Sequence, residues 1–268
     1  PGDESDVTRK ALLIGIGPGG PDQLTVEAVR ALNEVDVFLV ADKEAAAGRE
    51  GTGDLVALRE EICRRHITGN NYRIVTVPDP PRDRAPVADH GYGRQVRDWH
   101  AARARAYTDA IVKHTRPDEV LGFLVWGDPS LYDSTIRVVE RIRSCGVDLD
   151  YQVIPGVSSV QLLAARHRIV LNRIGGPITV TTGRRLGTDV ARGADTLVVF
   201  LDGCLSCAEL PGAGWDIWWG ANLGTASEEL VAGRLGEVMD AIRAARKRAK
   251  AAQGWVMDVY LLRRAAVS

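Results

Sequence analysis

The sequence lacks an excess of charge, a long apolar run and most of the signals that mark a specialised class of protein. Its 34 basic and 35 acidic residues leave a formal net charge of −1, which gives no indication of a nucleic-acid or membrane partner. No stretch approaches the roughly 20 apolar residues of a membrane-spanning helix. The 268 residues are 45% hydrophobic and 26% charged, so we expect a globular protein with one large or two ordinary domains.

Cysteine is also scarce, with four residues in the chain. Only Cys204 and Cys207 have the spacing of a redox or metal motif, but the sequence around them predicts no thioredoxin-like unit. A zinc site would need a second pair, and Cys63 and Cys145 stand alone. We therefore expect reduced structural thiols, no metal and a cytoplasmic location. The polar start of the sequence, PGDESDVTRK, has no apolar signal-peptide core and favours the same compartment.

The first part of the chain predicts a doubly wound α/β fold. Short apolar strands alternate about five times with helices up to residue 168, which favours a mostly parallel sheet. Strands are predicted at residues 10–17, 35–40, 72–77, 120–126 and 150–154, and helices at residues 25–33, 54–65, 95–114, 132–144 and 158–167. A loop rich in proline, glycine and charge is predicted at residues 78–94.

The second part of the chain has fewer helices between its strands. Strands are predicted at residues 178–182, 196–201, 215–221 and 255–262, with a helix inside residues 230–251. This pattern predicts a smaller α+β half with a mixed or antiparallel sheet. We therefore expect an N-terminal α/β domain at residues 1–168 and a C-terminal α/β domain at residues 169–268.

A glycine-rich loop follows the first predicted strand within LLIGIGPGGPDQLTVEAVRAL, residues 12–32. Its GxGxxG spacing at residues 15–20 matches the dinucleotide-binding fingerprint on paper. However, Pro18 and Pro21 intrude and delay the helix to about Thr25, so a pyrophosphate would not sit directly on the helix N-terminus. The loop lies where open α/β sheets bind ligands, although a tight turn without a ligand is the alternative.

Other loops that follow predicted strands carry candidate binding groups. Asp128, in WGDPSLY at residues 126–132, could accept hydrogen bonds from a ribose or an amino group, or form an Asx turn or helix cap. Ser158 and Ser159 open a helix after a Pro-Gly turn, and a plain serine cap is the alternative to ligand binding. Small residues indicate either a backbone-lined groove or ordinary turns at residues 202–203 and 220–225.

Arginines lie beside two of these regions. Planar guanidinium groups suit a ligand with several carboxylates, although a single arginine is more often a solvated surface residue. The candidates are Arg82, Arg84, Arg94 and Arg97 around the predicted long loop, and Arg184 and Arg185 after the strand ITVTTG. His100, beside Trp99 on a predicted helix, is either a packed side chain or a base. No HExxH, Walker, GxSxG or paired-carboxylate motif occurs.

Taken together, the loops resemble those of the tetrapyrrole (corrin and porphyrin) methyltransferase family. The motifs occur in the family's order and span nearly the whole chain: GIGPG at residues 15–19 with Pro21 and Leu24-Thr25, GDPSLY at 127–132, PGVSS at 155–159 and TLVVF at 196–200. The resemblance implies two α/β domains with S-adenosylmethionine in the cleft between them. It also implies a small-molecule tetrapyrrole substrate, S-adenosylhomocysteine as a product, and a homodimer.

The resemblance further implies which residues hold the two ligands. Cofactor contacts map onto Pro18, Trp126, Gly127, Asp128, Leu131, Tyr132, Ser158, Ser159, Leu201, Ala221, Asn222 and Leu223. Trp126 departs from the family pattern, because many relatives have a second glycine there. Our hypothesis is that peripheral carboxylates of the substrate bind to arginines beside the loops, namely Arg82, Arg94, Arg97, Arg184 and Arg185.

Within the family, the chain is most similar to members that methylate precorrin-5 at ring carbon 1 and release the extruded acetyl group as acetate. The similar segments are residues 54–63, 98–100, 126–132 and 181–186. Acetate release needs an activated water, for which His100 is favoured over Asp128 because the family places Asp128 at the cofactor. The alternatives are another precorrin or uroporphyrinogen methyltransferase, diphthine synthase, which acts on a protein, and a non-catalytic nucleotide- or tetrapyrrole-binding module.

Overall fold

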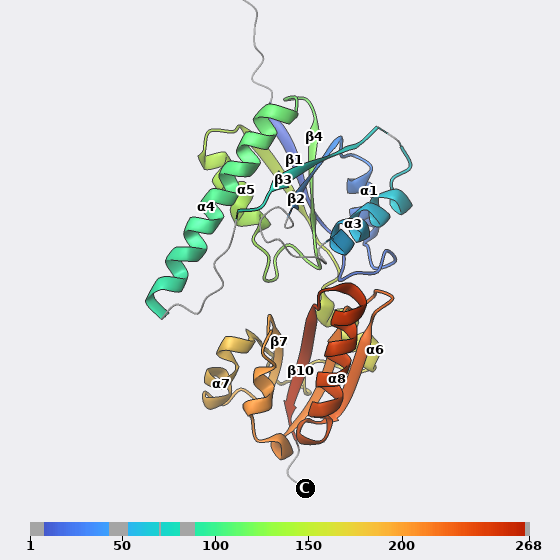
Figure 1. The fold of residues 1–268 in the computed structure, drawn as a ribbon, viewed down its shortest axis with the longest axis vertical. Coiled ribbons are helices and arrows are strands. Elements are labelled where there is room, and N and C mark those ends of the chain that lie inside the picture. The colour runs from blue at the N-terminus through green and yellow to red at the C-terminus, as the bar shows by residue number, and fades with distance from the viewer. Residues whose placement is uncertain (1–7, 43–52, 70, 81–88, 266–268) are drawn as a thin grey trace, which may run out of the picture. The chain divides into compact units, whose positions relative to one another are not determined.

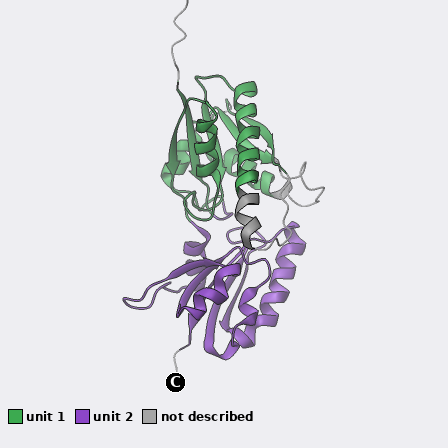
Figure 2. Cartoon of the chain, turned by 90° about the vertical axis from the view of Figure 1, so that its left-hand side faces the viewer, with its two compact units in different colours: residues 1–17, 21–157 green, residues 18–20, 158–268 purple. Residues whose placement is uncertain are grey.

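The computed structural model describes residues 8–42, 53–69, 71–80 and 89–265, and the chain divides into two compact units (Figure 2). Unit 1 comprises residues 1–17 and 21–157, and unit 2 comprises residues 18–20 and 158–268. The division falls just before helix α6 (Ser159–His167). This helix therefore belongs to unit 2, whereas it was expected in the first domain.

Unit 1 is built on a five-stranded parallel sheet with the strand order β3-β2-β4-β1-β5 (Figure 1). Its strands are β1 (Arg9–Gly15), β2 (Val37–Asp42), β3 (Arg73–Pro78), β4 (Val120–Val125) and β5 (Leu149–Ile154). The connecting helices are α1 (Val26–Leu32), α3 (Gly53–His66), α4 (Asp89–His114) and α5 (Thr135–Ser144). The parallel α/β sheet predicted for this half is confirmed.

Strand β1 shows why this sheet needs helices on both faces. Its side chains alternate, so that Ala11 and Leu13 pack in the core beneath α4 and α5, whereas Leu12 and Ile14 pack in the core beneath α1. All four are buried, which is why the strand reads as a continuous apolar run instead of an alternating one.

Unit 2 contains a mixed five-stranded sheet with the strand order β6-β7-β10-β8-β9. Strands β6 and β7 are parallel, and the other neighbours are antiparallel. The strands are β6 (Thr179–Thr182), β7 (Thr196–Phe200), β8 (Trp215–Ala221), β9 (Glu229–Arg234) and β10 (Asp258–Arg264). The helices are α6, α7 (Gly183–Ala191) and α8 (Leu235–Gln253), with short 3-10 turns η1 (Ser206–Glu209) and η2 (Gly212–Gly214).

The two faces of the second sheet are covered by different helices. Leu197 and Val199 of β7 pack in the same cluster as the buried side chains of α8. Val198, which points the other way, packs with Leu162 and Leu163 of α6. The mixed sheet predicted for the second half is confirmed.

Three elements differ from the sequence-based prediction. Helix α4 begins at Asp89, inside the loop predicted at residues 78–94. Helix α7 was not predicted, because it has few apolar residues and follows β6 without a break. Strand β9 lies partly inside residues 230–251, where only a helix was predicted, because its short half-buried stretch runs directly into α8.

The four cysteines are free thiols, as predicted. Cys63 and Cys207 are buried, and burial raises the pKa of each thiol to about 12. Such thiols are poor nucleophiles, because the reactive thiolate is not populated at neutral pH. Among the helices that the structure describes, none combines the length and the apolar character needed to cross a bilayer.

Candidate functional site

The connections of β1 and β4 create a switch point in the sheet of unit 1. These strands are neighbours, yet the chain leaves β1 through α1 toward β2 and leaves β4 through α5 toward β5 on the other side (Figure 1). The loops that follow the two strands therefore diverge at one edge of the sheet. Open α/β sheets bind their ligands at such a point, next to the carboxyl ends of the strands.

Three glycines bring the loops after β1, β4 and β5 into direct main-chain contact at this edge. A Cβ atom on Gly156 would lie 2.1 Å from the carbonyl oxygen of Gly127 and 2.8 Å from the Cα of Gly15. The Gly127 N–H also donates a hydrogen bond of 2.8 Å to the carbonyl of Gly17. Since no side chain fits between these segments, the loops offer main-chain atoms at the switch point.

The loop after β1 does not lead directly into a helix. Helix α1 begins at Val26, and the Thr25 hydroxyl accepts a hydrogen bond of 3.0 Å from the Ala28 N–H. This N-cap confirms the delayed helix that was predicted from the prolines. The GxGxxG spacing therefore does not form a Rossmann phosphate site, in which the helix follows the glycines at once.

The carboxylate of Asp128 is engaged within unit 1. One oxygen accepts a hydrogen bond of 2.9 Å from the Gly156 N–H, and the other accepts bonds from the N–H and the hydroxyl of Ser130. Burial raises the pKa of Asp128, but the hydrogen bonds from Ser130 and Gly156 outweigh it and leave the pKa below its usual range. Asp128 thus fastens the loop after β4 to the loop after β5, and its low pKa makes it a weak base.

The rest of the loop after β4 is partly open. Trp126, Gly127 and Leu131 are half-buried, and Tyr132 is 44% exposed. Gly127 and Tyr132 both have positive φ angles, of 65° and 54°. For a tyrosine this backbone conformation is strained, and such strain is concentrated at binding and catalytic sites.

In unit 2, the parallel strands β6, β7 and β8 end at one edge of the sheet. Because β7 and β8 flank β10 and both run antiparallel to it, Phe200 and Gly220 are both paired with Val259. Leu201 and Ala221, the next residues along each strand, therefore lie at the same edge. The start of α7, which carries Arg184, follows β6 at this edge as well.

The predicted residues after β8 offer main chain and not side chains. Ala221 and Leu223 are buried in the core. Asn222 is fully buried, and its amide accepts a hydrogen bond of 2.9 Å from the Met257 N–H and donates to Ser227 and to the Ala249 carbonyl. Asn222 therefore fixes a turn with a positive φ of 49°.

The tripeptide Pro18–Gly20 of the first loop groups with this turn. Pro18 is buried, and a Cβ atom on Gly19 would lie 2.7 Å from Thr225 and 2.8 Å from the Leu223 carbonyl oxygen. The structure thus brings predicted cofactor residues from distant parts of the sequence together in unit 2, namely Pro18 and the segment Ala221, Asn222 and Leu223.

Ser158 acts as the N-cap of α6. Its hydroxyl accepts a hydrogen bond of 3.2 Å from the Val160 N–H, and the Gln161 side chain accepts a bond of 3.0 Å from the Ser158 N–H. This capping box uses Ser158 in the way that the serine-cap alternative predicts. Ser159, the first residue of the helix, is half-buried.

Leu201 is the most unusual of the predicted cofactor residues. It is 68% exposed although it follows a buried strand, and its φ is +53°. Five residues other than glycine have positive φ in the part of the chain that the structure describes, and three of them, Tyr132, Leu201 and Asn222, were predicted from the sequence to contact the cofactor. For Tyr132 and Leu201 this conformation is strained, whereas asparagine adopts it more readily.

Asp202, next to Leu201, is held by a network that the sequence did not predict. It is 4% exposed and accepts hydrogen bonds from the Tyr260 hydroxyl at 2.5 Å and from the Ser206 N–H and hydroxyl at 2.7 and 2.8 Å. A Cβ atom on Gly183 would lie 2.3 Å from its carboxylate. The network fixes the strained Leu201. In the sequence, the feature that could have predicted this network is an aspartate that directly follows an apolar strand.

The predicted arginines and histidine have varied environments. Arg97 is exposed on α4, and Arg184 and Arg185 are exposed on the first turn of α7, where Arg185 pairs with Asp189 at 3.2 Å. His100 is half-buried on α4, with its ring 5.2 Å from that of Trp99. Three further candidates lie outside the described part of the chain: Arg82 and Arg84 as whole residues, and Arg94 with its side chain.

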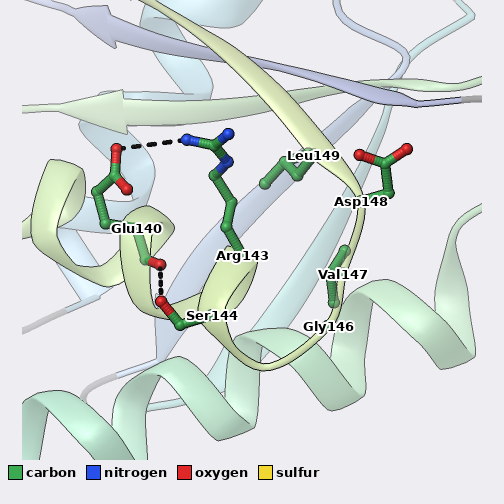
Figure 3. A pocket seen from close by; sticks show the side chains of 7 residues that line it. All are labelled: Glu140, Arg143, Ser144, Gly146, Val147, Asp148 and Leu149. Atoms are coloured by element: carbon green, nitrogen blue, oxygen red, sulfur yellow. Dashed lines mark hydrogen bonds and ion pairs between the residues drawn. The ribbon is translucent and has the colours of Figure 1, made fainter.

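A pocket of about 450 Å³ lies elsewhere in unit 1, between the end of α5 and the start of β5 (Figure 3). Its lining includes Glu140 and Arg143, which form an ion pair of 3.7 Å. The pocket lies beside the first residue of β5, at the edge opposite to the switch point. None of the residues predicted from the sequence to bind a ligand lines it.

An open parallel sheet with glycine loops at its switch point, together with strained loops at the strand ends of a mixed sheet, is typical of an α/β enzyme. The chain matches the family model of the Tetrapyrrole (Corrin/Porphyrin) Methylases over residues 1–239. It is 44% identical over 259 residues to the precorrin-6A synthase (deacetylating) of Sinorhizobium sp, covering 96% of each chain. The chain therefore belongs to the tetrapyrrole (corrin/porphyrin) methylases, as its motifs predicted.

Two solved structures are similar to the chain, one in sequence and fold and the other in fold alone. A cobalamin synthesis related protein from Corynebacterium diphtheriae is 36% identical and has a TM-score of 0.79, over 96% of this chain and 98% of that chain. A uroporphyrin-III C-methyltransferase from Thermus thermophilus, solved in complex with S-adenosylhomocysteine, shares the fold with a TM-score of 0.52 at 19% identity. That similarity covers 94% of this chain and 96% of the Thermus chain.

Proposed function

We propose that the protein is an S-adenosylmethionine-dependent C-methyltransferase of cobalamin biosynthesis. It methylates precorrin-5 at ring carbon 1 and releases the extruded acetyl group as acetate, giving precorrin-6A. The observation that carries the proposal is the 44% identity to a precorrin-6A synthase (deacetylating) along 96% of both chains. Relatives with other named substrates are less similar, such as the precorrin-2 C(20)-methyltransferase of Sinorhizobium sp at 29% over 55% of this chain.

The strand-end loops fit S-adenosylmethionine, which supplies an activated methyl group when bound. In unit 1 the loop from Trp126 to Tyr132 offers half-buried main-chain groups and an exposed tyrosine ring. In unit 2 the exposed, strained Leu201 offers an apolar surface. The same role is proposed for Pro18, Ser158, Ser159, Ala221, Asn222 and Leu223, of which the buried members contribute through the main chain. An exposed leucine held at positive φ supports this role, because folding alone gives no reason to keep it.

For the substrate, we propose that exposed guanidinium groups bind peripheral carboxylates. Arg97 and Arg184 are exposed, and Arg185 keeps part of its surface open beside Asp189. The same role is proposed for Arg82 and Arg94. A planar guanidinium can donate two parallel hydrogen bonds to one carboxylate, which orients the macrocycle as well as binding it.

Acetate release requires that a water oxygen adds to the acetyl carbonyl and that the carbon–carbon bond to the macrocycle then breaks. We propose His100 as the base that takes the proton from this water. Asp128 is a weaker candidate, because three hydrogen bonds lower its pKa and occupy both of its oxygens. Asp128 instead positions the loop that holds the cofactor.

The decisive experiment is anaerobic incubation of the protein with S-adenosylmethionine and precorrin-5. We expect a mass gain of one methyl group, NMR signals that place it at ring carbon 1, and one equivalent of free acetate. A His100→Ala variant should still methylate but release acetate more slowly. Methylation at another carbon would instead indicate another precorrin methyltransferase. Binding of S-adenosylhomocysteine without turnover of precorrin-5 or uroporphyrinogen III would indicate a non-catalytic module.

We also propose that the enzyme works in the cytoplasm as a homodimer, without a nucleic-acid or membrane partner. The near-neutral net charge of −1 and the free thiols support this setting. Light scattering on the purified protein should give a mass of about twice the 29.0 kDa of one chain. A mass of one chain at micromolar concentration would contradict the dimer without affecting the proposed reaction.

A further inference from the structure

An arginine on the inner side of α3 has no acidic partner within the described part of the chain. Arg59 is four residues beyond Leu55 and three before Ile62, so it lies on the apolar face of its helix. Its guanidinium carbon lies 4.9 Å from the centre of the Trp126 ring. Its other contact is a long hydrogen bond of 3.5 Å to the Leu55 carbonyl. Among the residues that the structure describes, no carboxylate lies within ion-pair distance of it.

The surroundings of Arg59 do not compensate its charge. The pKa of Arg59 is lowered to about 10, chiefly by burial; the positive charge of Arg103 adds to this lowering, and Tyr107 and Asp133 only partly offset it. Asp133 attracts Arg59, but its carboxylate accepts a hydrogen bond of 2.6 Å from the Thr135 N–H. Arg103, in contrast, has an acidic partner of its own in Asp79 at 3.2 Å. Among the described residues Arg59 therefore lacks an anion of its own, whereas buried cations are normally paired.

Trp126, on which Arg59 is stacked, also has an unused donor. Its indole N–H is closed to solvent and has no hydrogen-bond acceptor within the described part of the chain. An unsatisfied buried donor is costly, and it indicates an acceptor that joins the site from outside the protein. The guanidinium and the indole N–H thus present two kinds of donor from one small region of unit 1, both suited to a carboxylate oxygen.

Position in the fold connects this pair to the candidate site. Trp126 is the residue after β4 and the first residue of the loop that contains Gly127 and Asp128, at the switch point. Arg59 and Trp126 are both half-buried, so each side chain keeps part of its surface open to solvent. The face of the Trp126 ring supports the guanidinium of Arg59 by stacking.

We propose that Arg59, supported by Trp126, is a carboxylate-binding site of the enzyme. The carboxylate comes either from the periphery of the tetrapyrrole or from the methionine part of S-adenosylmethionine. This inference rests on the proposed function for the identity of the ligands. The existence of the site, in contrast, is inferred from the guanidinium that has no anion among the described residues. It adds a binding residue to the exposed arginines that the sequence suggested.

The test uses Arg59→Met, which keeps the length and apolar stem of the side chain but removes the charge. Affinity for S-adenosylhomocysteine is measured by calorimetry, and affinity for the octacarboxylate uroporphyrin III is measured by fluorescence, beside the KM for precorrin-5. We expect one of the two carboxylate ligands to bind about 10- to 100-fold more weakly, the range for losing a charged hydrogen-bonded contact. Weaker uroporphyrin III binding and a raised KM assign the carboxylate to the tetrapyrrole, and weaker S-adenosylhomocysteine binding assigns it to the cofactor.

Three further variants separate binding from a structural role. Arg59→Lys should restore part of the affinity, because it restores the charge without the planar fork. Trp126→Phe should weaken binding less than Arg59→Met, because it keeps a ring but loses the N–H. Arg64→Met is the matched control: Arg64 is exposed on the same helix and paired with Glu61 at 2.6 Å, so its loss should change neither affinity. The melting temperature of Arg59→Met should stay equal or rise, because an uncompensated buried charge is removed.

Two results would overturn the inference. One is a folded Arg59→Met variant that binds both ligands as tightly as the wild type. The other is a fall in melting temperature that accounts for the whole loss of binding, since this would make Arg59 a structural residue. Failure of the proposed function is recognised separately: precorrin-5 would not be turned over by the wild type, while the binding of uroporphyrin III or S-adenosylhomocysteine would still depend on Arg59.

Discussion

The contact among the loops after β1, β4 and β5 makes Gly156→Ala a sharp test of the site. The new Cβ atom would lie 2.1 Å from the Gly127 carbonyl oxygen and 2.8 Å from the Gly15 Cα, and both are main-chain atoms that cannot rotate away. Relief requires that at least one strand end moves by roughly 1 Å, since ordinary contacts begin near 3.4 Å. Overpacking of this kind typically costs 1–3 kcal/mol, and the rigid neighbours here place the expected loss at about 3 kcal/mol.

Thermal unfolding followed by circular dichroism should show this loss as a fall in melting temperature of about 6–12 °C. The affinity for S-adenosylhomocysteine should fall as well, because the Gly156 N–H donates to Asp128 and so positions the loop after β4. Gly69→Ala is the matched control in unit 1: no heavy atom lies within 4 Å of its added Cβ atom, so its stability should be unchanged or slightly raised. A Gly156→Ala protein that melts within about 2 °C of the wild type would refute the close-contact argument.

Three other perturbations have defined outcomes. Asn222→Ala should lower the free energy of unfolding, measured in urea, by about 3 kcal/mol, because it leaves the Met257 N–H without its acceptor and places alanine at a φ of 49°. A loss below about 1 kcal/mol would contradict this. Hydrogen bonds from Arg73, the largest cause, and from the Arg116 N–H lower the pKa of Glu119 from 4.5 to about 2 despite burial. The resulting stabilisation, about 2 kcal/mol after allowance for solvent around Arg73, is complete above pH 4.5 and lost as the pH falls toward 2. Glu119→Gln should remove that part of the acid dependence in unfolding measured across this range, and an unchanged slope would argue against the pair. A thiol reagent followed by mass spectrometry should label two exposed cysteines before unfolding and two buried ones only after it, namely Cys145 and Cys204 before Cys63 and Cys207.

Much of the fold could be predicted because burial leaves a direct pattern in the sequence. The strands of unit 1 are covered on both faces, so they read as apolar runs such as VLGFLV in β4. The pattern fails where burial is partial. Strand β9 is half-buried at the edge of its sheet, and α7 has only a few buried positions, so neither gives a clear period.

The site was predictable as a set of loops but not as a set of side-chain roles. Asp128, Ser158 and Asn222 all lie in the predicted loops, yet each side chain satisfies main-chain groups of its own unit. Whether a carboxylate faces a ligand or a neighbouring N–H depends on residues far along the chain, such as Gly156 for Asp128. Arg59 was missed for the opposite reason: the lack of an anion among its described neighbours becomes evident only in the folded chain. A charge on an apolar helix face was a usable signal.

The membership of residues 18–20 in unit 2 has a consequence for synthesis of the protein. Gly19 packs against Leu223 and Thr225, which lie about 200 residues later in the chain. At roughly 5–20 residues per second, the ribosome needs about 10–40 s to deliver these partners after Gly19 has emerged. The first unit can close around Gly17 and Gly127 in the meantime, because their bridge uses earlier residues. The tripeptide is thus the last part of the first loop to find its place, and the nascent protein cannot complete this loop until β8 has been made.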